Sequence, residues 1–142
     1  MPNGAEGEIP GRRGWSRRAS RLAVTWGPPI CWMALLFALS SLPGTDVGLS
    51  PYYAWVLRKC AHCAGYAILG ALVYRALART GWPLGAGTGV ASVALAGIYA
   101  FTDERHQLYV PARTGTWLDV GIDLAGATFA AVLVVRYVRR IG

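Results

Sequence analysis

A chain of 142 residues has room for one domain, and 54% of these residues are apolar while only 15% are charged. Soluble domains carry about a quarter charged residues, so the composition excludes an ordinary soluble protein. The net charge of +7 is the kind of value that nucleic-acid-binding proteins show, but here the basic residues flank long apolar runs. We therefore expect an integral membrane protein without a nucleic-acid partner.

The N-terminal part of the chain divides into a basic arm and a first apolar run. Residues 1–21 are rich in Gly, Pro and Arg, and we expect them to form a poorly ordered cytoplasmic arm. Residues 22–42 carry no charge, and their length suits a membrane span, which needs about 20 residues. Pro28 and Pro29 lie inside this run. Because proline is tolerated in the first turn of a helix, the regular helix is predicted to begin there.

The same segment permits a second interpretation as an export signal. Arg17 and Arg18 lie in a stretch that resembles a twin-arginine signal, and residues 38–40 (Ala-Leu-Ser) resemble a cleavage site. A first span with basic flanks produces the same pattern for topological reasons, so the uncleaved span is the favoured interpretation. The intact mass of the purified protein separates the two.

Three further apolar runs predict helices at residues 55–77, 84–102 and 117–137. A turn-rich loop at 41–53, a short turn at 81–83 and a polar loop at 103–116 connect the four runs, and residues 139–142 form a short cytoplasmic tail. Gly85 and Gly89 have the small-xxx-small spacing that lets helices approach closely. The sequence thus predicts an all-α fold, with a four-transmembrane-helix bundle over residues 22–138.

The positions of the basic residues predict the orientation of this bundle. If the N-terminus is cytoplasmic, the cytoplasmic segments contain ten of the fourteen basic residues and the outer segments contain four. The four outer ones are Arg58, Lys59, Arg105 and Arg113. Cytoplasmic loops are enriched in Lys and Arg, so both termini are expected in the cytoplasm.

Polar and ionisable side chains gather at the predicted outer end of the helices. They are Lys59, His62, Tyr66, Glu104, Gln107, Arg113, Asp119 and Asp123. Spacings of three, four or seven residues place those of each segment on one helix face, and the last two lie on a stripe that continues through Gly126 and Ala130. An ionisable group inside a span is costly unless it is paired or meets water, so we expect one shared interior site.

Structural roles are an alternative for several of these residues. Thr116 and Asp119 fit a capping box at the start of a helix, whereas Asp123 lies one turn deeper, where capping does not explain it. Arg113 is suited to an ion pair with Glu104 or Asp119 that holds the loop in place.

The three cysteines give no evidence of a disulfide framework or a metal site. Their number is odd, and Cys60-x-x-Cys63 lacks the second half that a zinc pair needs. Small thiols commonly pack as apolar residues. No metal and no cofactor are therefore predicted.

Three stretches resemble the VanZ-like family of small bacterial membrane proteins. They are Ser40-Ser41-Leu42-Pro43-Gly44, Lys59-x-x-His62-x-x-Gly65-Tyr66-x-x-Leu69-Gly70, and Glu104-x-x-Gln107-x-x-x-Pro111-x-Arg113-x5-Asp119-x3-Asp123-x2-Gly126. The resemblance covers about residues 29–135. It departs from the family pattern at Arg58, where the family typically has Asp, and at Asp123, where it typically has Asn. A compensating pair between these two positions is one interpretation.

The resemblance implies a four-helix protein of the bacterial cytoplasmic membrane, associated in the founding member with resistance to a glycopeptide antibiotic. The first functional hypothesis is recognition of a lipid-linked envelope precursor or an amphiphilic antibiotic at the outer leaflet. Lys59, His62 and Arg113 would contact phosphate or carboxylate oxygens, with Tyr66 and Gln107 completing the pocket. Membrane lipids and such an amphiphile are the expected partners.

Two further hypotheses remain open. The second is an intramembrane enzyme in which His62, Glu104, Asp119 and Asp123 act as general acids and bases in a cyclisation or hydrolysis of a hydrophobic substrate. The third is a structural scaffold for a membrane partner, in which the polar residues only lock the helices together.

Overall fold

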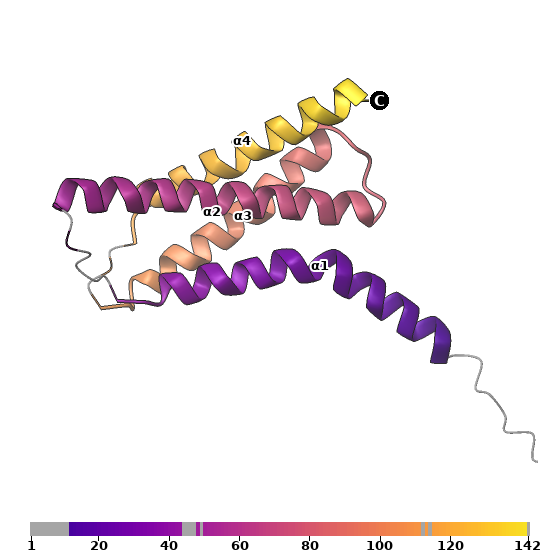
Figure 1. Ribbon diagram of the computed structural model, residues 1–142, viewed down its shortest axis with the longest axis horizontal. Helices are drawn as coiled ribbons and strands as arrows, with labels where there is room; N and C mark the ends of the chain where they lie inside the picture. The colour runs from indigo at the N-terminus through magenta and orange to yellow at the C-terminus, as the bar shows by residue number, and fades with distance from the viewer. Residues whose placement is uncertain (1–11, 44–47, 49, 112, 114, 142) are drawn as a thin grey trace, which may run out of the picture.

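The computed structural model describes residues 12–43, 48, 50–111, 113 and 115–141, which form four helices. They are α1 (Arg12–Ser40), α2 (Pro51–Arg79), α3 (Ala86–Gln107) and α4 (Trp117–Ile141). No strand occurs among the described residues, and the all-α prediction is confirmed. Figure 1 shows successive helices running in opposite directions. The ends of α1 and α3 and the starts of α2 and α4 therefore lie at one end of the bundle, here called the site end, and the end of α4 lies at the other.

Three of the described helical segments are long and apolar enough to cross a membrane. They are Arg18–Ser40, Pro51–Arg79 and Trp117–Ile141. Helix α3 is not among them; it contains several Gly, Ser and Thr residues and ends in charged residues. Large apolar side chains nevertheless face outward on all four helices, for example Val24, Leu57, Ile98 and Phe129. Apolar surface of this extent is typical of helices that face lipid.

Helix α1 extends through its two prolines. It begins at Arg12, with Pro28 and Pro29 inside it, so the prediction that the helix begins at these prolines is wrong. A proline removes one backbone hydrogen bond and bends a helix, but such breaks are tolerated in membrane helices because neighbouring groups compensate. Figure 1 shows the result, a bent α1 whose N-terminal part turns away from the other helices.

The apolar core lies along one face of α2, which packs most extensively against α4 and also contacts α1 and α3. Its buried residues recur at the spacing of an amphipathic helix and meet small residues of α3 and α4. They are Tyr66, Leu69, Val73 and Leu77 of α2, Ala96 and Ala100 of α3, and Ala127 of α4. Large side chains on one helix thus pack against alanines on its neighbours, which allows close packing.

Glycines set the close approach of α2 and α4. A Cβ atom on Gly126 would overlap the carbonyl oxygen of Cys63, and one on Gly70 would lie 3.1 Å from the Cα of Ala127. The predicted stripe through Gly126 and Ala130 is buried, which confirms it as the packing face of α4.

Only one of the two glycines with small-xxx-small spacing is in a helix contact. A Cβ on Gly89 would lie 3.2 Å from a methyl group of Val135 in α4, whereas nothing lies within 4 Å of one on Gly85. Gly85 instead lies directly before the first residue of α3. Its own φ is 150°, a conformation that L-residues rarely adopt.

The C-terminal end of α3 matters most for the site. Residues 103–107 were predicted to belong to a loop, but they continue the helix. Asp103, Glu104 and Gln107 are buried on it. The two carboxylates accept hydrogen bonds from Ser40 and Thr116 on other elements, and Gln107 donates to both carboxylates, so burial does not leave these groups unsatisfied. This extension brings two carboxylates of α3 into the bundle interior.

Candidate functional site

The site end contains a group of buried and half-buried polar side chains from all four helices. Its members are Ser40 of α1, Lys59 and His62 of α2, Asp103, Glu104 and Gln107 of α3, and Asp119 and Asp123 of α4. Because α2 is packed between α3 and α4, its Lys59 and His62 lie next to carboxylates of both neighbours.

Lys59 and Asp119 form an ion pair between α2 and α4. Asp119 also belongs to the N-terminal cap of α4, since its N–H donates to the hydroxyl of Thr116 (3.3 Å) and that hydroxyl donates back to its carboxylate (2.9 Å). The predicted capping role of Thr116 and Asp119 is thus confirmed. With these partners, Asp119 has a structural explanation.

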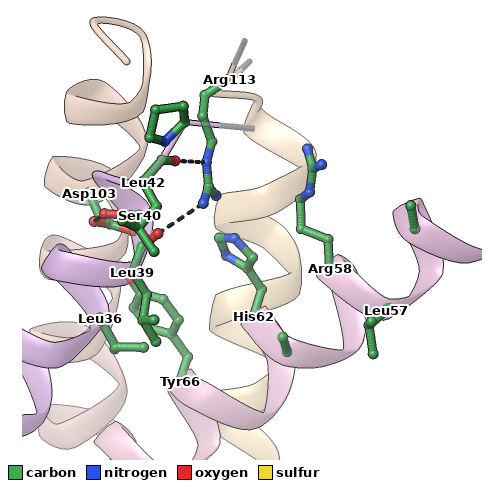
Figure 2. A pocket seen from close by; sticks show the side chains of 13 residues that line it. Leu36, Leu39, Ser40, Leu42, Leu57, Arg58, His62, Tyr66, Asp103 and Arg113 are labelled. Carbon is green, nitrogen blue, oxygen red and sulfur yellow. Dashed lines mark hydrogen bonds between the residues drawn. The ribbon is translucent and has the colours of Figure 1, made fainter. Parts of the chain in front are cut away.

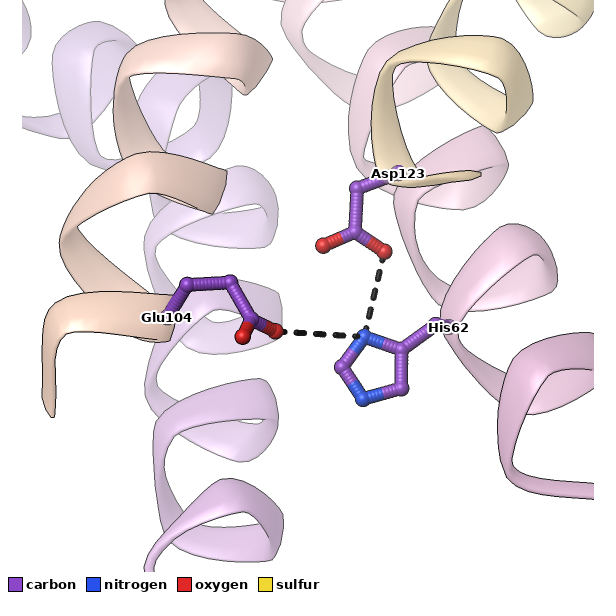
Figure 3. A group of neighbouring side chains, drawn as sticks. All are labelled: His62, Glu104 and Asp123. Carbon is purple, nitrogen blue, oxygen red and sulfur yellow. Dashed lines mark hydrogen bonds and ion pairs between the residues drawn. The ribbon is translucent and has the colours of Figure 1, made fainter. Parts of the chain in front are cut away.

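His62 lies between two carboxylates that come from different helices (Figure 3). Its Nδ1 is 3.1 Å from Oδ1 of Asp123 in α4 and 4.0 Å from Oε1 of Glu104 in α3. The Asp123 side chain is fully buried, and its second oxygen, Oδ2, has no hydrogen-bond partner among the described residues. His, Glu and Asp at these distances suit proton transfer or the binding of a cation.

Glu104 is held in place by donors on either side. The backbone N–H of Thr116 donates to Oε2 (3.0 Å), and the amide of Gln107 donates to Oε1 (3.2 Å). The same amide donates to Asp103 (3.1 Å), whose other oxygen accepts the hydroxyl proton of Ser40 (2.6 Å). These bonds fix the Glu104 carboxylate toward His62 without supplying a positive charge.

Beside this polar group, a pocket of about 360 Å³ opens between the end of α1 and α2. Figure 2 shows its apolar walls, with His62 and Tyr66 pointing into it and two arginines near its mouth. The lining residues include Leu36, Leu39, Leu42, Leu57, Arg58, His62, Tyr66, Asp103 and Arg113. The hydroxyl of Tyr66 is buried and has no hydrogen-bond partner among the described residues.

Arg113 attaches the α3–α4 loop to α1. Its Nε donates to the carbonyl of Leu42 (3.0 Å) and its Nη2 to the carbonyl of Leu39 (2.9 Å), so it caps the C-terminal end of α1. The expected pair with Glu104 or Asp119 is absent from the ion pairs of the described residues. Burial lowers the pKa of Arg113, and the charge of the nearby Arg58 lowers it further.

The structure divides the predicted site residues into two neighbouring groups. Lys59, Glu104, Gln107, Asp119 and Asp123 lie in the polar network, and Tyr66 and Arg113 lie at the pocket. His62 belongs to both.

Three residues of this region were not among the predicted site residues. Ser40 and Asp103 bond to each other across 63 positions of sequence, which no local spacing reveals. Arg58 was noted as one of the outer basic residues and as a departure from a family pattern, but not as a site residue, yet it lines the pocket. It does not neutralise Asp123 as a compensating pair, because the bonded oxygen of Asp123 contacts His62.

The cysteines take no part in the polar network. Cys31 and Cys60 are exposed, Cys63 is half-buried, and all three are free, as expected from their odd number. The carboxylate and imidazole atoms of His62, Glu104 and Asp123, by contrast, all lie within 4.8 Å of one another.

Comparison with known proteins identifies the chain at the level of a family. The family model described as VanZ/LLP1 matches residues 25–139, a range that takes in residues of all four helices and the whole polar network. No curated protein and no solved structure matches the chain. Together with three helices apolar enough to cross a bilayer, the match shows a membrane protein. The chain belongs to the VanZ/LLP1 family.

Proposed function

We propose that the protein binds an anionic amphiphile, such as a lipid-linked envelope precursor or an amphiphilic antibiotic, from the outer leaflet of the bacterial cytoplasmic membrane. The proposal rests on the pocket, because its lining combines apolar side chains with two guanidinium groups, those of Arg58 and Arg113. A phosphate or carboxylate would bind the arginines while an apolar chain lies along the leucines.

Arg113 retains donors for such an anion. A guanidinium has five N–H donors, and two hydrogen bonds of Arg113, to the carbonyls of Leu39 and Leu42, are recorded in the described part of the chain. The positive charges of Arg58 and Arg113 also lie near enough to repel each other. An anion bound between them would offset this repulsion. Lys59, which the sequence suggested as an anion ligand, is engaged by Asp119 instead.

The topology that this proposal needs is four membrane crossings with both termini in the cytoplasm. Helix α3 would be the fourth crossing, because it connects the two ends of the bundle and is packed against α2 and α4. Arg75, Arg79, Arg136 and Arg139 lie toward the end opposite the site, and by the positive-inside rule these basic residues support a cytoplasmic position for that end. The pocket would then open toward the outer leaflet.

The proposal is tested by binding in lipid nanodiscs. We expect a long-chain polyprenyl phosphate to bind the protein and the neutral polyprenol of the same length to bind much more weakly. Arg58→Gln should weaken phosphate binding roughly 10- to 100-fold, since a charge-assisted hydrogen bond contributes about 1.5–3 kcal/mol. Native mass spectrometry after mild extraction measures the bound fraction, and Arg105→Gln, on an exposed residue outside the pocket lining, is the matched control.

The proposal would be contradicted if the polyprenyl phosphate and the polyprenol bound equally well. It would also be contradicted if Arg58→Gln and Arg105→Gln weakened phosphate binding equally. Asp123→Asn provides a second comparison, because Asp123 does not line the pocket and its substitution should leave binding within about twofold.

A second function, an intramembrane enzyme, is favoured by one observation. His62 contacts Asp123 and lies near Glu104, which is an arrangement of a base beside two potential acids in a largely buried position. In that case the Asp123→Asn protein would still bind the hydrophobic substrate but would no longer convert it.

A further inference from the structure

We propose that His62, Glu104 and Asp123 bind one divalent first-row transition-metal ion, with Zn²⁺ as the reference case. Neutral imidazole together with carboxylates is a common ligand set for such ions. The site lies at the meeting point of α2, α3 and α4, and each helix contributes one ligand (Figure 3). This inference does not depend on whether the neighbouring pocket binds an amphiphile.

The distances between the ligand atoms fit a shared ion. A metal bonded to nitrogen and oxygen at about 2.0–2.2 Å holds neighbouring ligand atoms roughly 3.0–3.6 Å apart. The Nδ1 atom of His62 lies 3.1 Å from Oδ1 of Asp123 and 4.0 Å from Oε1 of Glu104, and all three ligand atoms lie within 4.8 Å of one another. A shift of about 1 Å at the end of the Glu104 side chain would complete the geometry.

An independent observation is the unpartnered oxygen of Asp123. Its side chain is 0% exposed, and Oδ2 has no hydrogen-bond partner among the described residues. In Figure 3 the Asp123 carboxylate points into the space between Glu104 and His62. A buried carboxylate oxygen without a donor is costly, and a cation in this space would satisfy it.

The charge balance of the described residues also favours a cation. Lys59 is paired with Asp119, so it does not neutralise Glu104 and Asp123, the two carboxylates that lie within ion-pair distance of His62. The donors to Glu104 are an amide side chain and a backbone N–H, both uncharged. A divalent ion would balance two buried negative charges in an environment where unpaired charges are strongly disfavoured.

Outer contacts orient the ligands in the way that metal sites require. The N–H of Thr116 and the amide of Gln107 fix the two oxygens of Glu104. Bonds of this kind orient ligands in protein metal sites and raise their affinity. Three protein ligands leave at least one coordination position for water or for an oxygen of a bound molecule, and His62 also lines the pocket.

The proposed metal site does not use the cysteines of the Cys60-x-x-Cys63 motif. Cys60 is exposed and Cys63 is half-buried, and neither belongs to the group of potential ligands around His62. The histidine between them therefore uses carboxylates from two other helices.

Metal titration of the full chain tests the proposal. Protein purified in mild detergent and stripped with EDTA is titrated with Zn²⁺ by calorimetry, and bound metal is counted by mass spectrometry after gel filtration. We expect about one ion per chain and a higher unfolding temperature with Zn²⁺ than without it. Co²⁺ should give visible absorption bands without the near-ultraviolet charge-transfer band of a thiolate ligand.

The chain offers a matched pair of variants, because it has two histidines. His62→Gln should lower the affinity by on the order of 100-fold, since outer contacts alone account for about 10- to 100-fold in known metal sites. His106→Gln should leave the affinity unchanged, because His106 stacks on Phe37 and bonds to Ser41 outside the site. Glu104→Gln replaces His62→Gln if the latter loses its helical circular dichroism.

Three results would overturn the proposal. They are a folded wild-type protein that binds no Zn²⁺ or Co²⁺, equal affinity losses in the His62 and His106 variants, and a thiolate charge-transfer band with Co²⁺.

Discussion

At the scale of single residues, the ion pair of Lys59 and Asp119 shows how a charge inside the bundle becomes a structural element. Both side chains are largely buried, with 14% and 6% of their surfaces exposed. Asp119 also accepts the hydroxyl proton of Thr116, so its charge stabilises both the start of α4 and the contact between α2 and α4. The pair is the part of the polar network with a clear structural role.

Lys59→Met should destabilise the protein by about 3–5 kcal/mol, because it leaves the buried carboxylate of Asp119 unpaired. The double variant Lys59→Met/Asp119→Leu should recover much of that loss, since it removes both charges. Reversible unfolding in detergent measures the free energies. An unchanged stability of Lys59→Met would show that the pair contributes nothing.

Among single residues, roles that depend on local spacing were predictable from the sequence, and contacts between distant segments were not. The capping role of Thr116 and the burial of Asp123 follow from local spacing, and the structure contains both. The bonds of Ser40 to Asp103 and of Arg113 to Leu39 join segments more than 60 positions apart. Such contacts depend on how helices are placed in space, which local periodicity does not determine.

At the scale of helices, the contact between α2 and α4 depends on the absence of side chains. Gly126 allows the backbone of α4 to reach the carbonyl of Cys63 directly, one residue from His62. The same close approach brings Asp123 within 3.1 Å of His62. Helix packing and the geometry of the site therefore depend on the same glycine.

Gly126→Ala should destabilise the protein by about 1–3 kcal/mol, because the added methyl group overlaps the backbone and forces the helices apart. Gly121→Ala is the matched control on the same helix, since nothing lies within 4 Å of its added Cβ, and it should be neutral or stabilising. Thermal unfolding in the same detergent compares the two. Equal effects would contradict the close contact.

Helix boundaries show the limit of sequence patterns at this scale. The continuous α1 contradicts the local rule that proline begins a helix, because membrane helices tolerate internal prolines. The end of α3 was placed too early, because charged residues such as Asp103 and Glu104 usually mark a loop. Their partners on α1 and next to α4 make helical burial possible here.

At the scale of the whole molecule, the four apolar runs and their basic flanks were sufficient to predict four helices. Each run is about as long as a helix that crosses a bilayer, so the number of helices follows from the lengths of the apolar runs alone. Helix α3 contains no candidate membrane span, and its place in the bundle comes from packing against α2 and α4.

Cysteine labelling checks the proposed orientation. In a variant without the three native cysteines, Tyr109→Cys should react with a membrane-impermeant maleimide in intact cells, because the site end would face outward. Trp82→Cys, at the opposite end, should react only after the membrane is permeabilised. Both native side chains are exposed, so access is not limited by burial. The reverse labelling pattern would contradict the orientation.

The clamp of Arg113 on α1 has a consequence for how the pocket would respond to a ligand. One guanidinium is both part of the pocket wall and the attachment of α1 through the carbonyls of Leu39 and Leu42. An anion that draws Arg113 toward itself competes with those carbonyls. By thermodynamic linkage, occupancy of the pocket and the docking of α1 are then coupled, so that whatever loosens α1 changes affinity and whatever binds changes the freedom of α1.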